Sequence, residues 1–377
     1  MLIKLKNVCK EFIVPQRNKP KVFDGNIPWC RIEDIEHKYI SKSLSDKCVS
    51  EKTVKEMNYR IYPINTVLFS CSATIGKVAI VKKPLITNQT FIGIVCDDSK
   101  LSYNYLYYYL KINKDNIANC GIGSTIKYIS RESFEEYEID LPSLEIQDKI
   151  TNILSNIDNQ IECNNAMTKR LQDMILTRYS IMFQNKKSKN ALLKDICLLP
   201  SGYNFKPESY NDYGKYKLIT IKNVCDTFVD DTNTDKLSEV PNIKDYCYLS
   251  VGDILLSLTG NVGRISIVHS KDNLLNQRVS LLQTKENYKI YSYCLLKSQE
   301  YQFIMTNIAR GTSQKNLSPI DVENLKVYAP TFEEIKAFNE NTENYFNEML
   351  IIKQSTDKLI TLKEKLLPLL INGQLNI

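Results

Sequence analysis

The sequence predicts an α+β protein made of two similar mixed domains, each followed by a long helix, with the two helices pairing as an antiparallel coiled coil. Three observations support this prediction. The chain has 377 residues, more than one ordinary core accommodates. One set of motifs occurs twice. A long segment with helical spacing of apolar residues follows each copy.

The repeat is visible in two glycine-bearing stretches, SCSATIGKVAI at residues 70–80 and SLTGNVGRISI at residues 257–267. Other matches recur at an offset of 188 or 189: Ile32 to Ile35 with Ile221 to Val224, Asn88-Gln89 with Asn276-Gln277, Gly123-Ser124 with Gly311-Thr312, and Pro142 with Pro330. Solenoid repeats have periods of only about 20–50 residues, so this long period indicates a duplicated domain.

Each copy contains a predicted hairpin, at residues 66–80 and 253–268, in which two runs rich in Val, Ile and Leu flank a glycine turn. A phosphate-binding P-loop would need a glycine at position 71, where the chain has Cys71. The Tyr- and Leu-rich segments that follow, 103–110 and 291–296, have helical spacing. We expect their aromatic rings to pack in a core rather than to stack on bases.

Two long helices are expected after the copies. Thr331 and Glu334 form a capping box, while Ser143 is a plausible N-cap with Glu145 in the first turn. The first helix, from 145 to 183, would be up to about 58 Å long. Pro368 should kink or finish the second. The residues expected to bury the two apolar stripes against each other are Ile150, Ile153, Ile157, Met167, Leu171, Met174, Phe338, Tyr345, Met349, Ile352, Leu359 and Leu366.

Composition narrows the class of protein. The net charge of +6 divides as +5 over residues 1–142, +2 over 143–190, +1 over 191–330 and −2 over 331–377. This mild basic bias permits DNA binding without indicating it. No apolar run approaches the roughly 18 residues of a membrane span, and the 11 cysteines are scattered singly. These features suggest a cytoplasmic chain without membrane partners. With two histidines and no thiol cluster, a zinc site is not expected.

An antiparallel pair of helices between two copies of a domain would relate the halves by an approximate two-fold axis. Duplex DNA has the same kind of symmetry, and paired modules on a stiff spacer can recognise two separated half-sites. A duplicated scaffold that binds other proteins has the same geometry. The geometry alone leaves both interpretations open.

Several motifs resemble one known family, the specificity (S) subunits of type I restriction-modification systems. They are LFSCSATIGKVAI with TNQTF, LLSLTGNVGRISI with NQRVSL, GTSQKNLSPIDVENLKVYAPTFEEI and the closing LKEKLLPLLINGQL. The resemblance covers essentially the whole chain. It implies target-recognition domains at 1–142 and 191–330, and spacer helices at 143–190 and 331–377.

The resemblance also implies a role for the chain. It would determine the DNA sequence specificity of a type I complex, recognise a bipartite site at fixed spacing, and dock methyltransferase (M) subunits, which restriction/translocase (R) subunits join. The chain would be non-catalytic and hold no cofactor, with S-adenosylmethionine, ATP and Mg belonging to its partners. An alternative is an S-like subunit serving a fused restriction-methyltransferase.

The sequence gives no independent sign of catalysis, since it has no [N/D]-P-P-[Y/F] motif and no P-loop. Cations and amides in the glycine-bearing turns and loops are the candidate DNA contacts: Lys77, Lys127, Arg264, Arg310, Gln314, Lys315 and Asn316. The pairs Asn88-Gln89 and Asn276-Gln277 recur in both copies. We therefore expect them to share a structural role rather than to select bases.

Overall fold

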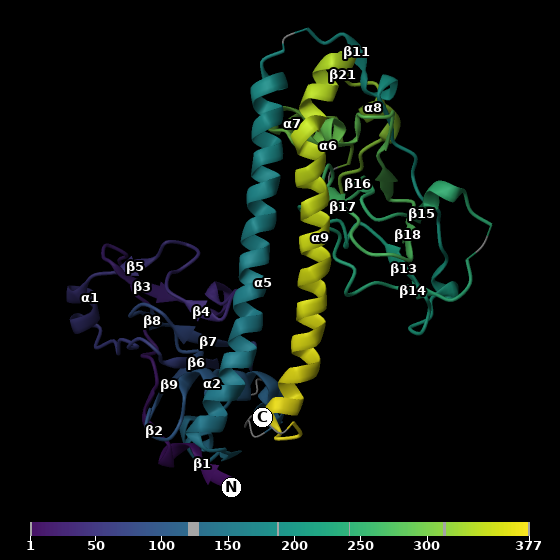
Figure 1. Ribbon diagram of the computed structural model, residues 1–377. Helices are drawn as coiled ribbons and strands as arrows, with labels where there is room; N and C mark the ends of the chain where they lie inside the picture. Colours follow the sequence, from purple (N-terminus) through teal and green to yellow (C-terminus); the bar gives the residue numbers. More distant parts are fainter. Residues whose placement is uncertain (1, 120–127, 187, 241, 312–313, 376–377) are drawn as a thin grey trace. The chain divides into compact units, whose positions relative to one another are not determined.

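The computed structural model describes residues 2–119, 128–186, 188–240, 242–311 and 314–375, and its chain divides into two compact units (Figure 1). Unit 1 comprises residues 1–159 and 360–377, and unit 2 comprises residues 160–359. Each unit contains one globular part together with a portion of both long helices. No helix formed by the described residues is long and apolar enough to span a membrane.

The globular part of unit 1 is built on strands. A five-stranded sheet has the order β2-β9-β6-β7-β4, a three-stranded sheet the order β5-β3-β8, and β1 pairs with β10. The strands are β1 (Leu2–Lys4), β2 (Cys9–Ile13), β3 (Ile27–Cys30), β4 (Tyr39–Ile40), β5 (Cys48–Val49), β6 (Val67–Ser70), β7 (Val78–Val81), β8 (Ile86–Thr87), β9 (Phe91–Cys96) and β10 (Glu138–Asp140). Four short helices accompany them: α1 (Glu51–Glu56), α2 (Tyr103–Ile112), α3 (Lys114–Asn119) and α4 (Arg131–Glu135).

Unit 2 repeats this plan. Its strands are β11 (Ala191–Leu192), β12 (Cys197–Leu198), β13 (Tyr216–Ile219), β14 (Lys236–Leu237), β15 (Tyr248–Leu249), β16 (Ile254–Ser257), β17 (Ile265–Ile267), β18 (Asn273–Leu275), β19 (Val279–Leu281), β20 (Gln283–Thr284) and β21 (Lys326–Val327). Its short helices are α6 (Lys289–Lys297), α7 (Gln299–Ile308) and α8 (Pro319–Glu323).

The strand pairings confirm the predicted duplication. The antiparallel pair β1/β10 corresponds to β11/β21, and the hairpin β6/β7 corresponds to β16/β17. The parallel pair β3/β8 corresponds to β13/β18. In each copy a second antiparallel strand, β5 or β14, lies beside the first member of that parallel pair.

The two predicted hairpin turns are also duplicated bond for bond. Ser70 Oγ donates to Thr74 O and accepts from Lys77 N–H, while Ser257 Oγ donates to Asn261 O and accepts from Arg264 N–H. Gly76 and Gly263 close the two turns at φ angles of +93° and +82°. Only glycine adopts this left-handed region freely, which explains why both copies carry it.

The aromatic segments pack as helices, as predicted. Residues Tyr105 to Leu110 of α2 are all buried against the unit 1 sheet, and α6 buries Ile290 to Leu296 in the core of unit 2. Phe69 and Phe134 add a close ring pair to the first core, with centroids 5.1 Å apart. These rings stabilise the domains and are not available to stack on bases.

The two long helices begin where the sequence indicates. Helix α5 covers Leu144–Tyr179 and continues as a π turn to Gln184. Helix α9 covers Phe332–Ile371, and the Thr331/Glu334 capping box is present, with reciprocal bonds of 3.3 Å and 3.0 Å. The helix runs three residues past Pro368. It ends at Gly373, which has a φ of +66°, and there Gly373 N–H donates to the carbonyl of Leu370 and Gln374 N–H to the carbonyl of Leu369.

Contacts inside unit 2 show that α5 and α9 are antiparallel. Asn164 donates to Thr356 Oγ1 at 3.1 Å, and Arg178, further along α5, donates to the carbonyl of Ala337, which lies earlier in α9. In unit 1 Asp158 of α5 forms an ion pair with Lys363 of α9. Within each unit, polar side chains of one long helix therefore pair with groups on the other.

Of the residues predicted to form the two apolar stripes, Ile150, Phe338 and Met349 are buried. Partly buried are Ile157, Leu171, Tyr345, Ile352, Leu359 and Leu366. The prediction is wrong for Ile153, Met167 and Met174, whose exposed fractions are 37%, 45% and 46%.

The physical reason is that the globular parts, and not the partner helix alone, decide which face of α5 is buried. Leu154 packs in the core of unit 1, and Ile175 and Tyr179 pack in the core of unit 2. Leu154 and Ile175 each lie one position after a residue of the predicted stripe, about 100° further round the helix, and Tyr179 lies about one turn after Ile175.

The duplicated turns give a stability prediction. Alanine at Gly263 should cost about 1–2 kcal/mol of unfolding free energy, because its φ lies in the left-handed region. Alanine at Gly76 should cost more, since its Cβ would also lie 2.8 Å from Lys114 Cβ, whereas the nearest atoms to a Cβ at Gly263 are 3.5 Å away. Urea unfolding of G76A and G263A measures both. Equal losses would contradict the role given to Lys114.

Candidate nucleic-acid interface

In unit 2 the structure brings the glycine turn and the later polar loop together. Gly260 N–H donates to Lys315 O at 3.1 Å, and Thr259 Oγ1 donates to Asn316 Oδ1 at the same distance. Arg310 and Asn316 exchange two backbone hydrogen bonds of 2.8 Å and 2.7 Å. Gln314, which precedes this bridge, is exposed. Four of the predicted contact residues therefore lie on one small loop.

The cations of this surface have partners within the protein. Arg310 forms an ion pair with Asp321 at 3.1 Å, although its side chain is 82% exposed. Lys315 Nζ donates to the carbonyl of Thr306 at 3.2 Å. Arg264 is exposed on the neighbouring turn. Exposed pairs of this kind contribute at most about 1 kcal/mol, so these cations can exchange their partners for a phosphate at little cost.

Unit 1 has the equivalent backbone bond between the glycine turn and the later loop, but the cation of its turn, Lys77, lies in a different environment. Ile129 N–H donates to Cys71 O at 2.9 Å, as Leu317 N–H donates to Leu258 O at 2.7 Å in unit 2. Lys77 is half-buried, and its Nζ donates to the carbonyl of Ile32 at 3.2 Å. Lys127 lies outside the described residues. A DNA contact for any of the seven candidates stays a prediction.

A buried polar cluster, which no sequence pattern predicted, connects the unit 1 domain to the portions of both long helices in that unit. Lys38, 7% exposed, donates to Tyr108 Oη at 3.1 Å and to Ser155 Oγ at 3.0 Å. Tyr108 Oη donates to Asp158 at 2.6 Å, and Asp158 also pairs with Lys363 of α9. Burial raises the pKa of Tyr108 far above its ordinary value, so the hydroxyl keeps its proton and remains a donor.

Unit 2 has a second buried cluster, centred on His269, which is 3% exposed. Its Nε2 lies 3.1 Å from Asp357 of α9 and 3.5 Å from Asp231. Asp231 accepts from Lys217 and Ser270 at 2.6 Å each. Gln354 of α9 donates to the carbonyl of His269 at 2.9 Å. The cluster thus ties the domain to α9 through charged hydrogen bonds.

The charges of this cluster are coupled. Burial opposes a charged imidazole, but hydrogen bonds to Asp231 and Asp357 outweigh it and raise the pKa of His269 above its ordinary value. The hydrogen bond from His269, with those from Lys217 and Ser270, lowers the pKa of Asp231 well below the usual range. The two carboxylates therefore favour the protonated imidazole of His269 more than water does.

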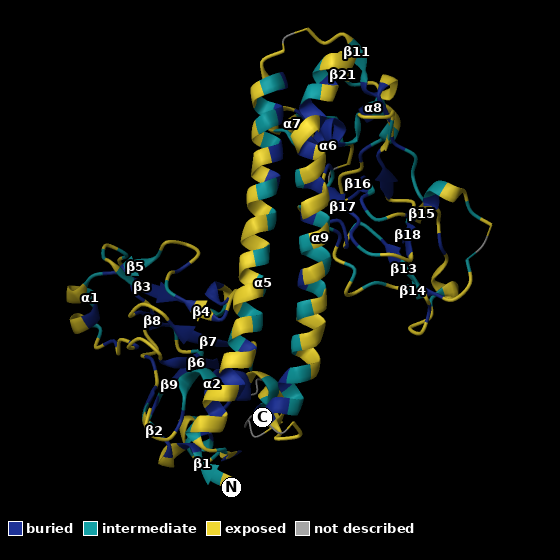
Figure 2. Cartoon of the chain, in the orientation of Figure 1, coloured by how far each residue is buried: buried dark blue, intermediate teal, exposed yellow. Residues whose placement is uncertain are grey.

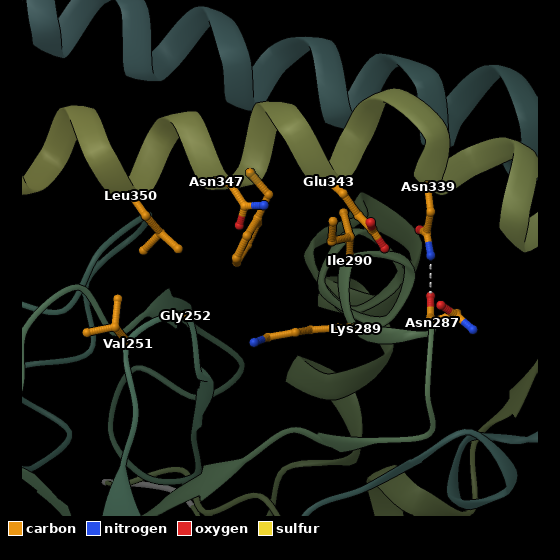
Figure 3. A pocket seen from close by; sticks show the side chains of 10 residues that line it. Val251, Gly252, Asn287, Lys289, Ile290, Asn339, Glu343, Asn347 and Leu350 are labelled. Carbon is orange, nitrogen blue, oxygen red and sulfur yellow. Dashed lines mark hydrogen bonds between the residues drawn. The ribbon is translucent and has the colours of Figure 1, made fainter.

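A shallow groove lies between α9 and the unit 2 domain (Figure 3). Two adjoining pockets of about 310 and 320 Å³ share Asn287, Asn339 and Glu343. Asn339 donates to the carbonyl of Asn287 at 2.8 Å, while its buried Oδ1 has no partner. No group of three or more potential metal ligands gathers among the residues that the structure describes.

The His269 cluster predicts how stability depends on pH. Because the folded pKa of His269 is raised, its stabilising contribution is complete below the unfolded value of about 6.5 and is lost as pH rises through the folded pKa. Each pKa unit corresponds to about 1.4 kcal/mol. Urea unfolding between pH 5.5 and 9 should show this loss in the native chain and not in His269→Gln.

His37 supplies the control, since it is exposed and is the only other histidine in the chain. His37→Gln should keep the pH dependence of the native protein. An unchanged pH slope in His269→Gln would show that the cluster does not hold a proton in the folded state.

Comparison with known proteins identifies the family. The model of the type I restriction modification DNA specificity domain matches residues 3–173 and again residues 185–361. The chain therefore belongs to this family, has two DNA specificity domains, and is the non-catalytic specificity subunit of a type I restriction-modification system.

Individual relatives extend over nearly the whole chain. It is 28% identical to the MjaIX specificity subunit of Methanocaldococcus jannaschii, with 96% of this chain and 90% of the relative covered. The MjaVIII specificity subunit of the same organism is 25% identical, over 92% and 88% of the two chains. The crystal structure of a type I S subunit from M. genitalium has the same fold, with a TM-score of 0.63 at 16% identity and coverage of 98% and 95%.

Proposed function

We propose that the chain recognises a bipartite DNA site, with the globular part of each unit contacting one half-site. The observation that supports this most directly is the duplicated domain framework with different exposed loops on the two copies. Two recognition domains that share a framework but differ in their exposed side chains are suited to two different half-sites.

We propose further that α5 and α9 set the distance between the half-sites. Each helix contributes residues to both units, and polar pairs such as Asn164 with Thr356 fix their register. A continuous helix is the stiffest spacer that a single chain can make, at about 1.5 Å per residue.

The same helices are the proposed docking platform for methyltransferase subunits, to which restriction/translocase subunits add. S-adenosylmethionine, ATP and Mg would be held by these partners and not by this chain. We place the complex in the cytoplasm, where cellular DNA is accessible and where the ten described cysteines, all unpaired, stay reduced.

The first test uses the chain together with its methyltransferase partner. The complex should protect and methylate a bipartite sequence, its affinity should fall steeply with salt concentration, and deletion of the gene should remove that methylation from the genome. Unchanged methylation after deletion would reject the proposal. A methyltransferase fused to the nuclease in the purified complex would favour the alternative of a fused enzyme.

The spacer is tested by lengthening both helices together. Seven residues inserted near Asn164 in α5 and seven near Thr356 in α9 add about 10.5 Å to each helix, which corresponds to about three base pairs. The methylated half-sites should move apart by that amount and keep their sequences. The same insertion in α5 alone should destabilise the protein, because it puts the interhelical pairs out of register. An unchanged gap after the double insertion would contradict the spacer role.

A further inference from the structure

An exposed polar loop between β2 and β3 forms one wall of a pocket in unit 1. The loop has the sequence QRNKP at residues 16–20, and the residues from Gln16 to Lys19 are all exposed. Tyr59, from outside the loop, donates its hydroxyl to the carbonyl of Asn18 at 2.5 Å. This bond gives a cationic, amide-rich loop a fixed position on the domain.

The pocket has a volume of about 190 Å³ and combines cations, amides and one indole ring. Its lining residues are Gln16, Arg17, Asn18, Lys19, Trp29, Asn88 and Gln89. Trp29, 3% exposed, forms the floor, and Lys19 Nζ lies 6.0 Å from the centre of its ring. The charged groups are lysine and arginine, so the pocket is suited to an electron-rich, anionic ligand.

The opposite wall is placed by the parallel strands β3 and β8. Asn88 follows β8, and its N–H donates to the carbonyl of Cys30 at the end of β3, at 3.2 Å. Its Oδ1 accepts from Thr90 Oγ1 at 2.7 Å. Asn88 therefore has the structural role expected from the repeat, and this role leaves the next side chain, Gln89, exposed at the pocket.

We call the end of the parallel strand pair, together with the loop beside it, a corner of the domain. Unit 2 has an equivalent corner with other side chains. Asn276 follows β18, its N–H donates to Ile219 O at 3.1 Å, and its Oδ1 accepts from Arg278 N–H at 3.2 Å. Gln277 and Arg278 are exposed, and Gln277 N–H donates to the carbonyl of Tyr203, from the loop after β12. The asparagine and glutamine are common to both corners. The loops beside them differ in part: Lys19-Pro20 recurs as Lys206-Pro207, whereas Asn204 stands where unit 1 has Arg17.

We propose that these two corners are the places where the domains contact base edges, and that Arg17 with Gln89 in unit 1, and Gln277 with Arg278 in unit 2, determine half-site specificity. This inference rests on the proposed function. Arginine donates to guanine and glutamine pairs with adenine in the major groove. Lys19 contacts a backbone phosphate and carries no sequence information.

Three of the candidate cations on the glycine turns and loops are already engaged within the protein. Lys77, Arg310 and Lys315 donate to groups of the protein itself. Among the described residues, the side chains of Arg17 and Gln89 have no hydrogen-bond or ion-pair partner, so their full donor capacity is open to DNA.

The test uses the full chain in complex with its methyltransferase partner and a library of DNA sites randomised in both halves. Arg17→Ala and Gln89→Ala should weaken discrimination in one half-site by about 5- to 150-fold and leave the other unchanged. Gln277→Ala and Arg278→Ala should weaken only the other half-site. Lys19→Ala should weaken all sequences alike and reduce the salt slope by about one.

Lys52→Ala is the matched control, because this lysine is 83% exposed on α1 of the same domain. It should leave both half-sites unchanged. Native discrimination in the Arg17 and Gln89 variants, or loss in the half-site that the unit 2 variants affect, would overturn the inference. A native complex that selects no sequence at all would instead reject the proposed function, so the two failures are distinguishable.

Discussion

The burial of the two long helices in the cores of the domains is the constraint on which the rest of this structure depends. Phe338, Phe346 and Met349 of α9 pack with Tyr179 of α5 in the unit 2 core, and Leu154 of α5 packs with Leu370 of α9 in unit 1. An isolated helix gains little from its own propensity, so these anchored ends supply most of its stability. Each unit therefore folds around its portion of both helices.

Between the anchored ends the residues of both helices are almost all exposed or half-buried. No residue from 155 to 171 of α5 is buried, and Thr356 is the single buried residue from 350 to 366 of α9 (Figure 2). An apolar seam would stabilise this stretch but would tolerate shifts of a whole heptad. A few polar pairs, such as Asn164 with Thr356, define the register at some cost in stability.

The buried clusters around Lys38 and His269 have a similar physical meaning. Burying a charge is expensive, and replacing such a cluster by apolar residues often leaves a protein equally stable. The clusters add directional contacts: Lys38 donates to Tyr108 and Ser155, and Nε2 of His269 lies between the carboxylates of Asp231 and Asp357. Both clusters restrict how a domain lies on the helix beside it, within its own unit.

The features that were predicted correctly from the sequence depend on residues that lie close together in the chain. The duplicated turn was recognisable because Ser70, Gly76 and their counterparts have fixed spacing, and the helix starts because caps are local. The orientation of α5 was predicted less well, since the domains decide which face is buried. The Lys38 and His269 clusters were not predicted at all. Their members are separated by up to about 325 residues, counted from Lys38 to Lys363, and no periodicity connects them.

The repeated Asn-Gln pair shows how one framework can carry two specificities. In both copies the backbone N–H of the asparagine donates to the last residue of the neighbouring parallel strand. Its Oδ1 accepts a hydrogen bond from the residue two positions further along the chain. Those bonds fix the backbone whatever the neighbouring loop contains. The loop after β12 is bonded to these strands through backbone groups of Gly202 and Tyr203, so the side chain at Tyr203 can change without disturbing the strands beneath it. A chain built in this way can change one half-site while the other, in a separate core, is unaffected.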